Sequence, residues 1–117
     1  MSEPTREQKM DTARTRMAEL AGRFLERTAG DVATLRAACA RVASGEPGPV
    51  GDIRHLAHRM VGTGATLGFE RLSGLAASIE RLAESCEPGV LPDSRWCGQV
   101  GFAIDALAAE LAQLRVG

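Results

Sequence analysis

The stretch HLAHRMVGTGATLG, residues 55–68, places both histidines of the chain and three of its 13 glycines in one amphipathic segment. Apolar residues recur at three- and four-residue spacing through it and just before it, at Ile53, Ala57 and Met60, which predicts a helix over about 52–67. A glycine inside a helix costs about 0.5–1 kcal/mol relative to alanine. The interior glycines of this helix therefore need a local reason.

The two interior glycines are predicted to lie on opposite faces of the helix. At about 100° per residue, Gly64 falls within about 40° of Ile53 on the apolar face, where a missing side chain lets a neighbouring helix approach closely. Gly62 falls about 180° from Ile53, between His58 at about 140° and His55 at about 200°. Helical side chains lean toward the N-terminus, so a side chain four residues after His58 would cover its imidazole. Glycine at that position predicts an exposed ring that is open from its C-terminal side.

Helical periodicity continues on both sides of this segment. Ala, Leu, Arg and Glu dominate and no segment alternates with the period of a strand, which predicts an all-α fold: an up-down-up-down antiparallel four-helix bundle with an additional N-terminal helix packed at one end. Gly30 suggests the end of one helix and Asp31 the N-cap of the next, although one bent continuous helix fits the same pattern. We expect one domain, residues 1–117, with helices over about 5–28, 31–44, 52–67, 69–86 and 93–115.

Composition disfavours several classes of function. The formal net charge is −1, so the chain has no overall basic field to attract nucleic acid. The first residues are polar and no apolar run has the length of a membrane span, so neither a secretory signal nor a membrane location is expected. We expect a cytoplasmic location. Cys39, Cys86 and Cys97 are odd in number and form no CxxC pair, so we expect buried thiols rather than disulfides or a zinc site.

The segment AHRMVGTGATLGFERLSGLAASIERL, residues 57–82, resembles the phosphorylation-site region of histidine-containing phosphotransfer (HPt) domains of two-component phosphorelays. The resemblance rests on positions in register within an all-helical chain: His58, Gly62, Leu67, Gly68, Ile79 and Glu80. It implies a phosphorelay intermediate in which His58 accepts a phosphoryl group and exchanges it with aspartates of response-regulator receiver domains, or with a hybrid sensor histidine kinase. It also implies no ATP-dependent kinase activity of the chain's own and no cofactor, since the divalent metal would belong to the partner receiver domain.

Three residues near His58 are candidates to support this chemistry. The family usually has lysine three residues after the histidine, where this chain has Val61. Arg54, one helical turn before His58, and Arg59 are candidates to replace that cation, although both also fit solvated surface residues. Glu80 on the following helix is the candidate to hydrogen-bond and orient the ring, or is a solvated carboxylate.

Partner docking is expected around Val61, Gly64 and Glu84, with exposed arginines assisting encounter with the acidic pocket of a receiver. The absence of lysine at Val61 also favours an alternative function: an HPt-like docking module that binds receiver or kinase domains without efficient phosphotransfer.

Two other hypotheses concern the histidines themselves. His55 and His58 are three residues apart on one helix, a spacing that suits a transition metal, but no third ligand is evident nearby and no metal site is predicted. A bundle with two incidental surface histidines is the remaining alternative, and it leaves the outward-facing Gly62 without a reason.

Overall fold

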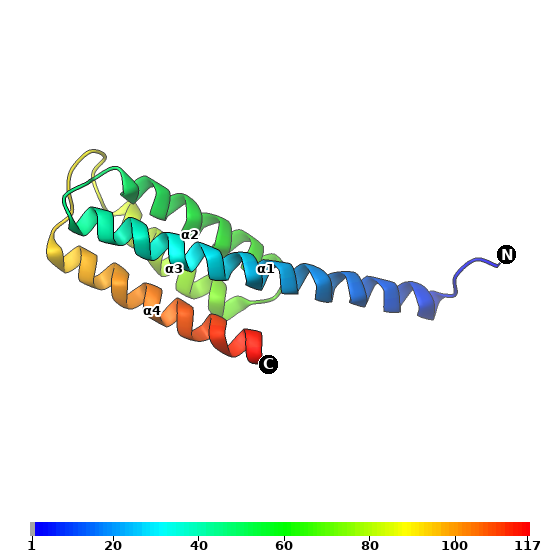
Figure 1. The fold of residues 1–117 in the computed structure, drawn as a ribbon. Coiled ribbons are helices and arrows are strands. Elements are labelled where there is room, and N and C mark those ends of the chain that lie inside the picture. The colour runs from blue at the N-terminus through cyan, green and yellow to red at the C-terminus, as the bar shows by residue number, and fades with distance from the viewer. Residues whose placement is uncertain (1) are drawn as a thin grey trace.

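The computed structural model describes residues 2–117 and contains helices but no strands in that range. The helices are α1 (Arg6–Ala43), α2 (Pro49–Thr66), α3 (Glu70–Glu84) and α4 (Ser94–Val116). The chain reverses direction at each of the three connecting loops (Figure 1). α1 and α3 each contact both α2 and α4, so the helices enclose one common core. The predicted all-α fold class is confirmed.

α1 is one continuous helix of 38 residues, so the prediction of separate helices over 5–28 and 31–44 is wrong and the continuous alternative is correct. Gly30 lies inside the helix, and Asp31 does not begin a new one; its carboxylate lies 3.7 Å from the Arg59 guanidinium of α2. Burial of one stripe on both sides of Gly30 offsets the helical cost of glycine, about 1 kcal/mol. The buried residues of that stripe are Phe24, Thr28, Val32, Leu35, Ala38 and Val42.

Local chemistry sets the helix ends. α1 begins with a capping box, in which the Thr5 hydroxyl accepts from the Gln8 backbone N–H and the Gln8 side chain accepts from the Thr5 N–H. α2 begins at Pro49, three residues earlier than predicted, because proline has the φ and the missing N–H that suit a first helical position. The turn from α2 to α3 passes through Gly68, whose φ of 85° lies in the left-handed region.

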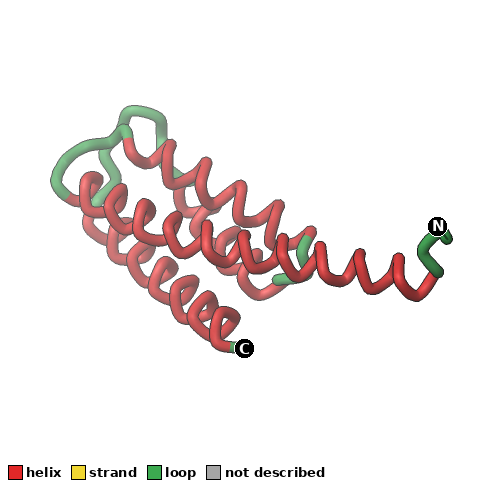
Figure 2. Tube along the Cα trace, turned by 45° about the vertical axis from the view of Figure 1, so that its right-hand side comes forward, coloured by secondary structure: helices red, strands yellow, loops and turns green. Residues whose placement is uncertain are grey.

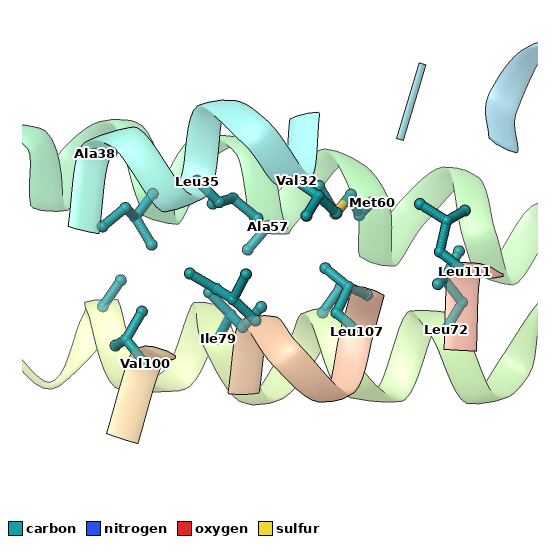
Figure 3. Close-up of a cluster of buried hydrophobic side chains, with 14 of the residues drawn as sticks. Val32, Leu35, Ala38, Ala57, Met60, Leu72, Ile79, Val100, Leu107 and Leu111 are labelled. Atoms are coloured by element: carbon teal, nitrogen blue, oxygen red, sulfur yellow. The ribbon is translucent and has the colours of Figure 1, made fainter. Parts of the chain in front are cut away.

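The core is a column of apolar side chains to which every helix contributes (Figure 3). Leu35 of α1, Ala57 and Met60 of α2, Ile79 of α3 and Leu107 of α4 are each no more than 1% exposed. The apolar face predicted for α2 is therefore buried. Its burial fixes the rotation of α2 about its own axis and so decides which residues of this helix face outward.

The first part of α1 projects beyond the other helices (Figures 1 and 2). The molecule is accordingly elongated, with extents of 64 × 26 × 18 Å. The additional helix predicted over 5–28 does not pack as a separate helix at one end of the bundle: its earlier residues form this projection, whereas Phe24 and Thr28 are buried in the bundle. Met10, Met17 and Leu20 on it are 49%, 48% and 47% exposed. None of the helices in the described residues is both long and apolar enough to cross a membrane.

The three cysteines are free thiols and half-buried, rather than fully buried as expected. Burial raises the pKa of the Cys39 and Cys86 thiols, and the nearby Cys97 raises both further. The neutral thiol is therefore favoured at both positions, which suits packing residues rather than nucleophiles.

Candidate phosphoacceptor site

His58 lies in the middle of α2 on the face directed away from the core. Its side chain is 72% exposed, whereas its neighbours Ala57 and Met60 are buried. His55, one turn earlier, is also exposed. The outward orientation predicted for both histidines is confirmed, and packing of the inner face of α2 is its physical cause.

Glu80 of α3 is in hydrogen-bonding contact with the His58 ring. The distance from His58 Nδ1 to Glu80 Oε2 is 2.6 Å, and the Glu80 side chain is only 16% exposed. A carboxylate only accepts hydrogen bonds, so Nδ1 carries the hydrogen and donates it. The neutral ring is thereby held in the tautomer whose other nitrogen, Nε2, has a free lone pair.

Gly62 leaves open space one turn beyond His58. A Cβ atom built at Gly62 meets nothing within 4 Å, and the residue is exposed. The outward position predicted for Gly62 is therefore confirmed, whereas its role in keeping the imidazole open stays a prediction.

Gly64 has the opposite environment, although it lies only two residues further along α2. A Cβ there would lie 3.4 Å from Ser73 Cβ of α3 and 3.6 Å from Phe24 Cζ of α1. Close approach of α2 and α3 at this point also lets the Ser73 hydroxyl donate to the Val61 carbonyl at 2.8 Å. Gly64 is buried, so its predicted place in a docking surface is wrong, and the close-packing role predicted for it is correct.

A groove of about 840 Å³ lies beside His58, between α1 and α2. Leu20, Phe24 and Arg27 of α1 line one side, and His58 and Gly62 of α2 line the other. His58 and Gly62 thus line one concave surface together with residues of α1.

A sequence model of the Hpt domain family matches residues 19–117 of this chain. The chain belongs to this family. Hpt domains are phosphotransfer modules of two-component signalling and interact with receiver domains or histidine kinases. No curated protein and no solved structure matches the chain. The family match includes all of α2, α3 and α4 and excludes residues 2–18, which comprise most of the projecting part of α1.

The two arginines proposed as lysine substitutes occupy different places in this Hpt domain. Arg59 lines the groove beside His58 and lies 3.7 Å from the Asp31 carboxylate. Arg54 instead lines a second hollow, of about 700 Å³, together with Glu84. Arg54 and Glu84 thus lie outside the groove, and Arg59 is the one of the two predicted arginines that lines it together with His58.

The arrangement around His55 shows no metal-ligand set. His55 lines a shallow hollow with Asp52, His58 and Arg59, among others. In residues 2–117, no three His, Cys, Asp or Glu side chains gather closely enough to hold a metal ion.

Arg23 and Arg27 of α1 are charged residues of the groove that the sequence did not predict. Both line the groove with His58, from a helix about 35 residues away in sequence. Their only signal in the sequence is their position next to the apolar stripe at Leu20 and Phe24. That signal acquires meaning only once α1 is known to pack against α2.

Proposed function

We propose that this Hpt domain is a phosphorelay intermediate that accepts a phosphoryl group on His58 Nε2 and exchanges it with receiver-domain aspartates or with a hybrid histidine kinase. The observation that supports this proposal is the 2.6 Å hydrogen bond from His58 Nδ1 to Glu80. It commits one ring nitrogen to Glu80 and leaves the other exposed as a nucleophile. An incidental surface histidine has no need of a largely buried carboxylate at this distance.

The transfer step balances without a base. The Nε2 lone pair attacks phosphorus of a phospho-aspartate, the Nε2–P bond forms, and the acyl P–O bond breaks with its electron pair passing to the departing aspartate carboxylate. The ring keeps its Nδ1 hydrogen and becomes positively charged. The Glu80 carboxylate offsets that charge. Transfer onward to another receiver is the same step in reverse.

The partner supplies the rest of the chemistry in this proposal. Phosphoryl transfer needs positioning and neutralisation of the phosphoryl oxygens, commonly by a divalent cation. We assign that cation to the receiver domain and the role of presenting a fixed imidazole to this chain.

The test is incorporation of acid-labile, base-stable phosphate from a panel of phosphorylated receiver domains. Wild-type protein is compared with His58→Gln and with His55→Gln, which removes the neighbouring exposed histidine as a matched control. Label that is lost only in His58→Gln supports the proposal. Receiver binding without any label supports instead a docking module in which Val61, at the usual lysine position, accounts for inefficient transfer.

A further inference from the structure

The projecting part of α1 carries an apolar seam that no other element covers. Met10, Met17, Leu20 and Phe24 follow one another at spacings of seven, three and four residues, which keeps them on one side of the helix. The first three are about half exposed, whereas Phe24 is 5% exposed and belongs to the core. The seam is therefore the core stripe of α1 continued outside the bundle.

The seam leads into the groove beside His58. Leu20 and Phe24 line both the seam and the groove, and the groove also contains His58 and Gly62 of α2. A protein that approaches His58 from the side of Gly62 enters this groove. It therefore also meets the lower end of the seam.

Cations follow this surface along its length. Lys9, Arg16 and Arg23 each precede a seam residue by one position and so lie along the same edge of it. Arg27 and Arg59 continue the positive charge into the groove. Arg16 and Arg27 make no ion pair in the part of the chain that the structure describes, and Arg23 has only an exposed contact of 3.9 Å with Glu19.

This charge pattern argues against a second copy of the chain as the partner. If two copies pack their seams together in antiparallel orientation, the edge with Lys9, Arg16 and Arg23 of one copy faces the same edge of the other. If they pack in parallel orientation, Lys9 of one copy faces Arg14 of the other. Both arrangements bring like charges together, which disfavours them. An acidic surface with apolar side chains at its centre is complementary.

We infer that the seam, its basic edge and the groove form one docking surface for an acidic face of the protein that exchanges phosphoryl groups with His58. This inference rests on the proposed function. It assigns docking to α1, including residues outside the family match, instead of to Gly64 and Glu84. Arg16 and Arg27 contribute to attraction and affinity, and Met17 and Leu20 contribute apolar contact.

The test is the affinity of the full-length protein for each receiver domain of the source organism, measured by fluorescence anisotropy. For the receiver that binds wild type most tightly, we expect Arg16→Glu/Arg27→Glu to weaken binding about tenfold or more, with the loss shrinking as salt rises. Met17→Ser should weaken binding at every salt concentration. Arg95→Glu is the charge control, since Arg95 is exposed in the first turn of α4, at the opposite end of the bundle from the projection (Figure 1). It should change affinity less than about twofold.

The outcomes separate this inference from the proposed function. The docking surface is overturned if Arg16→Glu/Arg27→Glu binds the receiver as tightly as wild type, or if Arg95→Glu weakens binding equally. It is also overturned if the wild-type protein binds no receiver. Each of these results counts even if His58 is labelled. If Arg16→Glu/Arg27→Glu and Met17→Ser weaken receiver binding as expected but no phosphate is incorporated on His58, the docking surface is supported and the phosphoacceptor assignment is overturned. Two further results also overturn the docking surface: a dimer by light scattering that Met17→Ser dissociates, and binding to phosphatidylserine vesicles that Arg16→Glu abolishes while receiver affinity is unchanged.

Discussion

The two faces of α2 differ most clearly at two glycines that are two residues apart. At Gly64, on the inner face, a Cβ would lie 3.4 Å from α3, and the glycine permits close helix packing. At Gly62, on the outer face, a Cβ would meet nothing within 4 Å, so packing gives no reason for glycine there. Glycine thus permits close helix packing on the inner face, and on the outer face the proposed function gives it a different role, access of a partner to His58.

The largest effect is expected from His58→Gln, which should abolish phosphotransfer and leave stability almost unchanged. This change removes the nucleophile, so phosphate incorporation should be lost completely. The ring is exposed, so the free energy of unfolding should change by no more than about 0.5 kcal/mol. Urea unfolding and radiolabel transfer measure the two effects. Large destabilisation in His58→Gln would show that the outer face also supports the fold.

The next largest effect is expected at the inner face. Gly64→Leu places a bulky side chain between Ser73 and Phe24, and we expect it to lower the free energy of unfolding by about 2–3 kcal/mol through overpacking. Thermal and urea unfolding measure the loss. A Gly64→Leu protein as stable as wild type would mean that α2 and α3 separate there without cost.

Gly62→Leu is the matched change at the outer face. Leucine should lean over the His58 ring and slow phosphotransfer about 10- to 100-fold by displacing the incoming phosphoryl group. Stability should stay the same or rise slightly, because glycine is a poorer helix former. Gly62→Ala, which adds one methyl group, is the control and should stabilise the helix by about 0.5–1 kcal/mol with a smaller effect on rate. Normal transfer by Gly62→Leu contradicts the role assigned to the open ring.

The smallest effect is expected from Glu80→Gln. The amide oxygen can still accept from Nδ1, but it carries no charge to offset the imidazolium that forms during transfer. We expect a loss of about tenfold in transfer rate, equivalent to about 1.4 kcal/mol, at an unchanged affinity for the receiver. Single-turnover kinetics over a range of receiver concentrations separate rate from affinity. A change in affinity alone would make Glu80 a docking residue instead of an orienting one.

The face of α2 was predictable from sequence because one helix generates it. Residues 53–64 carry a clear 3.6-residue period, and that period alone places His58 and Gly62 outward and Gly64 inward. The break expected at Gly30 was wrong because local turn signals compete with tertiary packing, and the stripe from Phe24 to Val42 favours an unbroken helix.

The groove was not predictable in the same way. Arg27 and His58 share it only because α1 packs beside α2, and no local pattern relates the two residues. Arg54 was a reasonable candidate from helix geometry, but the loop after Ala43 and the end of α3 enclose it in a different hollow. Contacts between helices decide which cations line the groove with the imidazole, and the periodicity of a single sequence does not contain those contacts.

The central claim is that Glu80 occupies Nδ1 of His58 and leaves Nε2 to carry the phosphoryl group. The most direct test is to phosphorylate ¹⁵N-histidine-labelled protein with a receiver domain and to assign the phosphorylated nitrogen by NMR. We expect a single phosphohistidine, at residue 58, with phosphorus bonded to Nε2. Phosphorus on Nδ1 of His58, or on His55, would contradict it.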